Sequence, residues 1–135
     1  MNEKNQLRLI DANLNRLREG IRVVEDIFRY VYNDKQTSSK LKNLRHLVRL
    51  ENYKEILQTR DVQNDVLRES IKSEQNRSDI YSILIANFKR AQESSRVLEE
   101  FTKLISIKDS ENFKYIRYEL YNLEMVLTKI TSNSK

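Results

Sequence analysis

Several residue types are missing or rare in this 135-residue sequence. It contains no Cys, Pro or Trp, and only one Gly and one His. Without Cys, and with a single His, the chain has no thiolate nucleophile, no zinc ribbon and no multi-histidine metal site. A bound metal would need oxygen ligands from Asp or Glu, which favours Mg²⁺. One glycine cannot form a glycine-rich phosphate loop, so side chains and helix N-termini would have to hold any nucleotide.

Long apolar runs are missing as well. No stretch approaches the roughly 20 apolar residues of a membrane span, and the N-terminal sequence lacks the hydrophobic region of a signal peptide. We therefore expect a cytoplasmic protein with no membrane partner. Hydrophobic residues make up 39% of the chain and include seven Tyr and four Phe, which is enough for one core. We expect a single domain over residues 1–135.

The charge is basic but mixed. The formal net charge is +5, and acidic residues are interleaved with the Lys and Arg along the whole chain. A nucleic-acid-binding helical protein would have one continuous basic face, and the mixed signs argue against it. A net charge of this size fits either an ordinary basic protein or a partner such as a phosphorylated small molecule.

The apolar pattern predicts long helices. Few Gly and Pro leave little material for the turns of a β-rich fold. Apolar residues recur at alternating spacings of four and three, which predicts a helix over residues 8–33 that packs along one seam. A second long helix is predicted over residues 78–106, with Asn76, Ser78 and Asp79 as its candidate N-terminal cap. The two seams consist of Ile10, Leu14, Leu17, Ile21, Val24, Phe28 and Val31, and of Leu84, Phe88, Ala91, Leu98 and Ile105.

The two halves of the chain are related by an internal duplication. Residues 12–25 align with residues 86–99 without gaps, and most identical positions lie outside the apolar seam. A second helix follows each copy, with Arg45 in the first and Arg117 in the second. We expect an antiparallel bundle of two hairpins, about residues 5–58 and 76–132, with approximate twofold symmetry. The identities are Ala12/Ala86, Asn13/Asn87, Arg16/Arg90, Glu19/Glu93, Arg22/Arg96, Val23/Val97 and Glu25/Glu99.

A polar strip runs beside the seam in both copies. On a helical wheel Asn13 and Arg16 share one flank with Gly20, and Asn87 and Arg90 occupy the same places in the second copy. Gly20 leaves room for a ligand or for another helix. One interpretation is a shared cleft in which guanidinium groups bind phosphate oxygens. The alternative is a set of surface ion pairs at i, i+3 spacing, such as Arg16 with Glu19.

Two other features allow a functional and a structural interpretation. The polar stretch 57–77 is predicted to be a long loop, and Asp61 and Asp65 within it are four residues apart, a spacing that can hold a hydrated Mg²⁺. Asp61 can equally cap a helix or pair with Arg60. His46 is a candidate acid or base, but a lone histidine on a helix is also compatible with a packing role.

The residues from Asp11 to Asp26, DANLNRLREGIRVVED, resemble the signature of the small all-helical hydroxymethylpyrimidine-phosphate kinase family of thiamine biosynthesis. Further stretches match in the same order: 41–46, Arg60-Asp61, Asp65-Val66, 86–93, 96–101 and 117–124. The resemblance implies phosphorylation of 4-amino-5-hydroxymethyl-2-methylpyrimidine phosphate to the diphosphate, with ATP and Mg²⁺. One departure is Leu67, where the family has Gly.

The resemblance assigns roles to matching residues. Phosphoryl transfer needs positive charge around the phosphates, a metal, and a group that orients the accepting oxygen. Asp61 and Asp65 are the expected metal ligands. Asp11, Glu93 and His46 are the candidate catalytic groups. The expected substrate and phosphate contacts are Asn13, Arg16, Arg45, Arg60, Asn87, Lys89 and Arg90.

A non-catalytic function is the main alternative. A helical module of this kind would dock on a separate thiamine-phosphate synthase and hold its pyrimidine substrate. The sequence leaves open whether the chain forms a homo-oligomer.

Overall fold

The computed structural model describes residues 3–50, 60 and 77–130, and all regular structure in these residues is helical. This confirms the all-α class. Apart from Arg60 and Arg77, the predicted loop 57–77 lies outside the described residues. The elements are α1 (Glu3–Asp26), the π-helical turn η1 (Ile27–Val31), α2 (Lys35–Leu47), α5 (Ile80–Thr102), α6 (Ile107–Glu124) and the short α7 (Leu127–Ile130).

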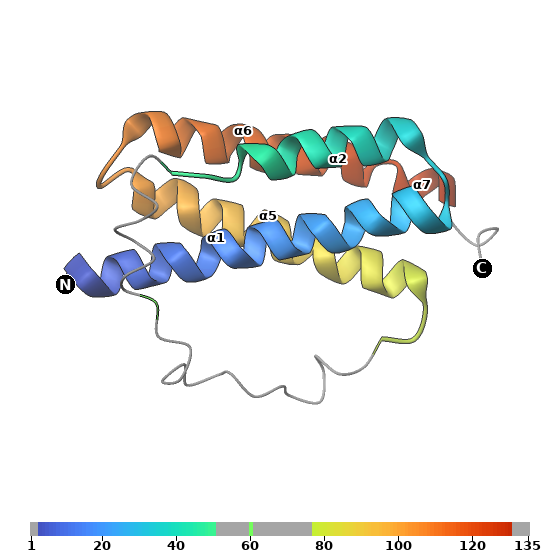
Figure 1. Ribbon diagram of the computed structural model, residues 1–135, viewed down its shortest axis with the longest axis horizontal. Coiled ribbons are helices and arrows are strands. Elements are labelled where there is room, and N and C mark those ends of the chain that lie inside the picture. The colour runs from blue at the N-terminus through green and yellow to red at the C-terminus, as the bar shows by residue number, and fades with distance from the viewer. Residues whose placement is uncertain (1–2, 51–59, 61–76, 131–135) are drawn as a thin grey trace.

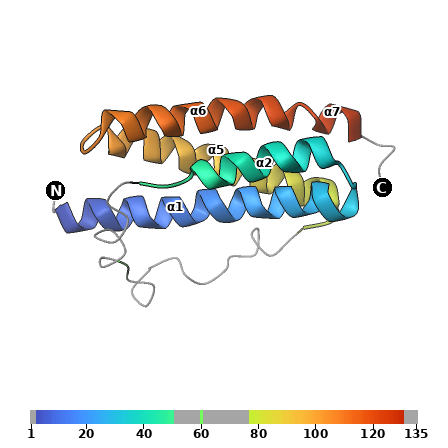
Figure 2. The same cartoon turned by 45° about the horizontal axis from the view of Figure 1, so that its top comes forward.

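The four long helices form an antiparallel bundle (Figures 1 and 2). Helix α1 packs along α5 in the most extensive contact of the molecule, and α5 packs in turn on α6. Helix α2 folds back on α1 and touches α6 more lightly. Each half is thus a hairpin, and the hairpins meet through their first helices. None of the described helices is both long and apolar enough to cross a membrane.

The core follows the predicted seams with two exceptions. Apolar residues of the first seam from Ile10 to Phe28 are all buried, as are those of the second from Leu84 to Leu98. Val31 is exposed because it lies in η1, where i→i+5 bonding changes the rotation per residue. Ile105 is exposed because α5 ends at Thr102. The predicted helices 8–33 and 78–106 were therefore correctly placed, and their ends differ by two to seven residues from those of α1 and α5.

Side-chain caps define three helix starts. The Asp79 carboxylate accepts from the backbone N–H of Ser82, so Asp79 is the one of the three candidate residues that caps α5. Asp34 and Ser106 cap α2 and α6 in the same way, through the N–H groups of Thr37 and Asp109. Such caps satisfy N–H groups that have no partner within the helix.

Gly20 marks the crossing of α1 and α5. A Cβ atom at this position would lie 3.1 Å from the backbone oxygen of Asn87 and 3.4 Å from Cβ of Ala91. Of the two uses predicted for the missing side chain, the structure shows another helix in that space. The backbones approach closely here, which offsets the roughly 1 kcal/mol that a mid-helix glycine costs.

A buried ion pair ties the two helices of each hairpin together. Arg45 of α2 donates from Nε and Nη2 to the two carboxylate oxygens of Glu25 in α1, at 2.6 and 3.2 Å. Arg117 of α6 donates from the same two atoms to one oxygen of Glu99 in α5, at 3.1 and 3.0 Å. The glutamate side chains are 2% and 7% exposed. The duplication thus repeats a structural contact as well as a sequence.

These contacts also show in the pKa of each arginine. The hydrogen bond from Glu25 raises the pKa of Arg45, and it outweighs the opposing effect of burial. For Arg117, burial lowers the pKa, but hydrogen bonds to Glu99 and Tyr121 outweigh it and leave the pKa raised. Both guanidinium groups therefore stay charged at every pH at which the protein is folded.

We predict that Glu99→Ala lowers the free energy of unfolding by about 3 kcal/mol or more, because it leaves the largely buried Arg117 charge without its partner. The double variant Glu99→Ala/Arg117→Met should be more stable than Glu99→Ala alone, since it removes that stranded charge. Denaturant unfolding measures both. Glu100→Ala is the control and should change stability much less, because its side chain is 41% exposed and its ion pairs with Arg96 and Lys103 lie at the surface. Equal stability of Glu99→Ala and Glu100→Ala would contradict the assignment.

Candidate functional site

Arg16 and Arg90 both lie at the crossing of α1 and α5. Arg16 is one helical turn before Gly20, and Arg90 adjoins Ala91, the residue that Gly20 contacts. Both arginines are exposed. Among the residues that the structure describes, neither has a carboxylate partner, whereas Arg22 pairs with Asp26. Of the i, i+3 pairs that the surface ion-pair interpretation predicted, Arg16 with Glu19 does not form, whereas Arg96 lies 3.5 Å from a carboxylate oxygen of Glu99.

The two asparagines of the polar strip behave identically. Asn13 donates its side-chain N–H to the carbonyl of Leu9 at 2.9 Å, and Asn87 donates to the carbonyl of Ile83 at 2.8 Å. Each bond runs four residues back within its own helix. Asn13 is buried and Asn87 is half-buried. The backbone bonds hold both amides in place beside the α1–α5 crossing, where Asn87 lies against Gly20.

Asp11 and Arg60 form a bidentate pair. Arg60 donates from Nε to Oδ2 at 2.8 Å and from Nη2 to Oδ1 at 2.9 Å. The Asp11 side chain is 4% exposed and that of Arg60 is 35% exposed. This contact joins α1 to a residue 49 positions away in the sequence. Both oxygens of Asp11 accept from Arg60, so the carboxylate positions that guanidinium.

Asp11 also departs from the symmetry of the two halves. The equivalent residue in α5 is Ile85, so the second half contains no carboxylate at this place. On α1, Asp11 and Asn13 are about 160° apart around the helix axis, given 3.6 residues per turn. The Asp11–Arg60 pair and the Asn13–Arg16 strip therefore lie on different flanks of α1.

The remaining predicted residues are dispersed. Arg45 is held by Glu25, and Lys89 lies 3.4 Å from a carboxylate oxygen of Glu124. Glu93 and His46 are exposed. Asp61 and Asp65 lie outside the described residues. In the described ranges no group of three acidic or histidine side chains is placed to hold a metal ion.

Neither of two cavities between the described helices is lined by the four residues of the predicted polar cleft. One, of about 350 Å³, lies between the end of α1, η1 and α2. The other, of about 370 Å³, lies where Leu47 and Arg49 at the end of α2 meet Lys108 and Asn112 of α6. A common cleft of Asn13, Arg16, Asn87 and Arg90 stays a prediction.

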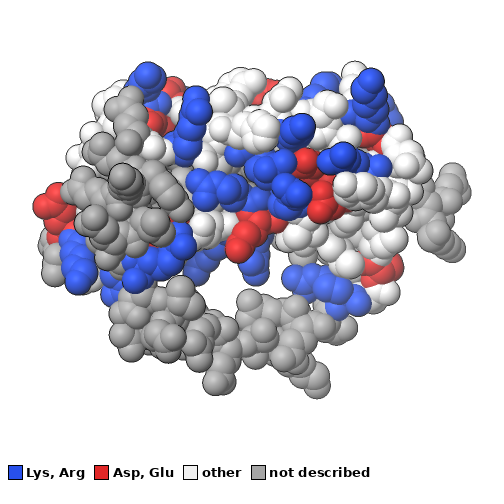
Figure 3. All heavy atoms as spheres, viewed as in Figure 1, with Lys and Arg blue, Asp and Glu red and all other residues white. Residues whose placement is uncertain are grey.

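Basic and acidic side chains alternate on the face shown in Figure 3. Lys and Arg gather over α1 and α2 but are interrupted by Asp and Glu. This distribution suits a small anion better than the length of a nucleic acid.

The buried ion pairs of Glu25 and Glu99 with the following helices were not predicted from the sequence. The recurrence of both glutamates, together with Arg45 and Arg117 in the following helices, was visible in the alignment of the halves. Two charges of opposite sign that recur together indicate contact. Arg45 was instead assigned to phosphate, and the structure shows that its Nε and Nη2 both donate to Glu25.

Fold and site together define a small all-α domain built from a duplicated hairpin, with two exposed arginines where the halves cross. Within that class, the chain belongs to the ThiD2 family, which it matches over residues 8–126. No solved structure matches the chain.

Three similar curated proteins are each longer than this chain. It is 40% identical over 126 residues to a thiamine-phosphate synthase of Prochlorococcus marinus, covering 93% of this chain and 36% of the relative. It is 40% identical over 118 residues to a thiamine-phosphate synthase of Nostoc sp. (strain PCC 7120), covering 87% of this chain and 34% of the relative. It is 33% identical over 138 residues to one from Rhodopirellula baltica, covering 96% and 37%. The chain thus spans about a third of these relatives.

We predict that Asp11 and Arg60 are energetically coupled. In a double-mutant cycle of Asp11→Asn and Arg60→Ala, the coupling in unfolding free energy should be about 1 kcal/mol, because the bond is bidentate but Arg60 is partly exposed. The same cycle on the exposed pair of Arg22 and Asp26 should give about half of that or less. Additive effects at Asp11 and Arg60 would show that the contact contributes nothing to stability.

Proposed function

We propose that this chain acts in thiamine biosynthesis and phosphorylates 4-amino-5-hydroxymethyl-2-methylpyrimidine phosphate to the diphosphate with ATP. Membership of the ThiD2 family and the thiamine-phosphate synthases among its relatives support this pathway. The resemblance of residues 11–26, 41–46 and 86–101 to the kinase family supports the reaction.

The observation that carries the proposal is the placement of Arg16 and Arg90. Two exposed guanidinium groups, one from each half, lie at one helix crossing, and no described carboxylate neutralises either of them. Phosphate oxygens accept two parallel hydrogen bonds from such a planar fork. The backbone-held amides of Asn13 and Asn87 lie beside them and can bond to the edge of a pyrimidine ring.

The chemistry of the acceptor explains why a general base is dispensable. The attacking atom is an oxygen of the substrate's own phosphate, which is largely ionised at pH 7 because its second pKa is about 6. That oxygen bonds to the γ-phosphorus of ATP as the bond to the β-phosphate oxygen of the departing ADP breaks. Catalysis then consists of positioning and charge stabilisation. This agrees with an Asp11 that is occupied by Arg60, and with an exposed Glu93 and His46.

In this scheme Arg16 and Arg90 bind the substrate phosphate. Arg60 is held by Asp11 on another flank of α1, so the scheme gives it no contact with that phosphate. Mg²⁺ would accompany the ATP phosphates and reduce their repulsion toward the incoming oxygen. Asp61 and Asp65 are its proposed ligands, and Asp61 directly follows Arg60 in the sequence. Lys89 is proposed as a further phosphate contact at the α5 surface.

The second candidate function is docking on a thiamine-phosphate synthase without catalysis. Its support is the outer face of α6, where Tyr115, Tyr118 and Tyr121 are 53%, 52% and 41% exposed. The equivalent residues of the first half are Asn43, His46 and Arg49, so the fold does not require aromatic residues there. Exposed tyrosines are typical of protein interfaces.

An assay of the purified chain with ATP, Mg²⁺ and the pyrimidine monophosphate tests the reaction. We expect the pyrimidine diphosphate and ADP in equal amounts, resolved by phosphorus NMR. A reaction without the pyrimidine substrate controls for ATP hydrolysis. Substrate binding without diphosphate formation would instead support the docking function.

The substrate contacts are tested by Arg16→Ala and Arg90→Ala. Each should weaken binding of the pyrimidine phosphate by about 1.5 to 3 kcal/mol, the range for a hydrogen bond to a charged group, while thermal stability stays nearly unchanged. The control is Arg22→Ala, which removes an exposed arginine that pairs with Asp26. Isothermal titration calorimetry measures all three. Wild-type affinity in both test variants would remove these arginines from the site.

A further inference from the structure

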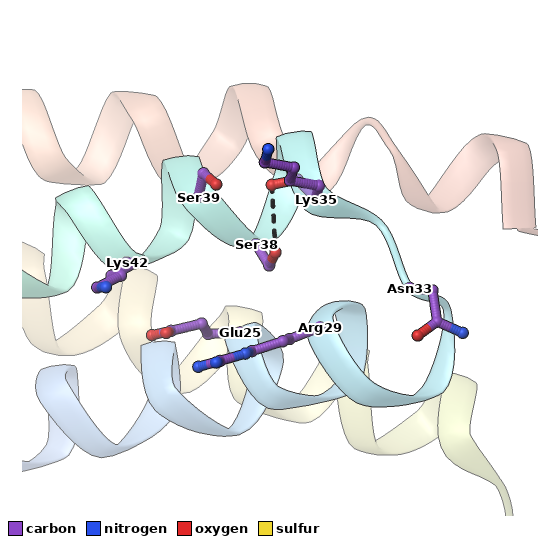
Figure 4. A pocket seen from close by; sticks show the side chains of 7 residues that line it. All are labelled: Glu25, Arg29, Asn33, Lys35, Ser38, Ser39 and Lys42. Carbon is purple, nitrogen blue, oxygen red and sulfur yellow. Dashed lines mark hydrogen bonds between the residues drawn. The ribbon is translucent and has the colours of Figure 1, made fainter.

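The cavity between the end of α1, η1 and α2 has the composition of an anion site. Its volume is about 350 Å³, and Glu25 and Arg29 lie next to each other beneath α2 (Figure 4). Its lining contains three cations, two hydroxyl groups and one amide besides Glu25, namely Arg29, Lys35, Lys42, Ser38, Ser39 and Asn33.

The single carboxylate of the lining is already neutralised. Both oxygens of Glu25 accept from Arg45, and its side chain is 2% exposed. By contrast, Arg29, Lys35 and Lys42 have no carboxylate partner in the described part of the chain. The guanidinium carbon of Arg29 lies 5.0 Å from the ring centre of Tyr30, which is a neutral contact. The cavity therefore presents three positive charges that no described carboxylate compensates.

The second half of the chain shows that the fold does not need this cavity. Ser110, the equivalent of Ser38, donates to the carbonyl of Glu99 at 2.8 Å and links α6 directly to α5. Ser38 instead donates to the carbonyl of Lys35 within its own helix. In the second half, Ile107 is the equivalent of Lys35, and Glu111 is the equivalent of Ser39. Each of these differences makes the first half more positive.

The connection between the helices also differs. Equivalent residues are offset by 74 in α1 and α5 but by 72 in α2 and α6, so the first hairpin has two more residues at its turn. They are accommodated by the π-helical turn η1 and by Asn33, whose φ is +52°. Single π-helical turns occur frequently at functional sites. The cavity lies beside this longer connection, and Asn33 of the connection is part of its lining.

From these contacts we infer that the cavity binds the diphosphate group of a small phosphorylated molecule, at a site separate from the proposed substrate site. A diphosphate carries enough negative charge for three cations, and its oxygens accept from Lys, Arg and Ser. The cavity lies on the α2 side of α1, whereas Arg16 and Arg90 lie at the crossing with α5. It is also fourteen residues, about 21 Å, along α1 from Asp11.

The test is calorimetric titration with inorganic pyrophosphate, followed by ADP and by thiamine diphosphate to identify the molecule that carries the group. The variant Lys35→Ile/Ser39→Glu installs the residues of the second half and should weaken pyrophosphate binding at least about tenfold. Lys42→Gln should weaken it about tenfold. These side chains are exposed, so the helices should stay folded, which circular dichroism verifies.

The second half provides matched controls. Lys114→Gln removes the equivalent of Lys42 and should leave pyrophosphate affinity unchanged, as should Arg16→Ala. An equal loss in Lys114→Gln would show unspecific attraction and overturn the proposal. A loss in Arg16→Ala alone would move the anion to the substrate site and overturn it as well. So would the absence of pyrophosphate binding at millimolar concentration, whether or not the chain phosphorylates the pyrimidine.

Discussion

The bundle depends on a buried carboxylate and guanidinium in each hairpin. Removing two charges from water is costly, and mutual attraction repays the cost only when their geometry is good. Glu25 with Arg45, and Glu99 with Arg117, meet this condition through two N–H donors each. A shift of one helix by a single turn would leave both charges buried and apart. The main effect of the pairs is therefore to fix how the two helices of each hairpin are aligned along their axes. Apolar seams alone specify this alignment poorly.

Fixed hairpins make the crossing of α1 and α5 reproducible. A Cβ atom at position 20 would lie only 3.1 Å from the backbone oxygen of Asn87, so glycine permits the closest approach of the two helices here. Residues just outside that contact then occupy set positions on the surface. Arg16 and Arg90 are such residues, and their placement follows from the packing beneath them. In this way the same duplication that forms the core also places one arginine from each half at the same crossing.

The sequence was informative wherever a pattern repeats. Periodic apolar residues predicted the two longest helices, and the cap at Asp79 was recognisable from its residue type. The partners of polar residues were harder to infer, because they depend on contacts between helices. Arg45 looked like a phosphate ligand since nothing local showed that Glu25, twenty residues away, holds it. Val31 was misplaced because a π-helical turn has no clear signal in the sequence.

The unequal turns of the two hairpins also bear on how the chain tolerates change in length. After a duplication both copies have the same number of residues, so the two-residue difference reflects a later insertion or deletion at one turn. A π-helical turn, with its i→i+5 hydrogen bonds, accommodates an extra residue without ending the helix. The turn between α1 and α2 thus contains two more residues than the turn between α5 and α6, and the buried pair of Glu25 and Arg45 behind it still forms.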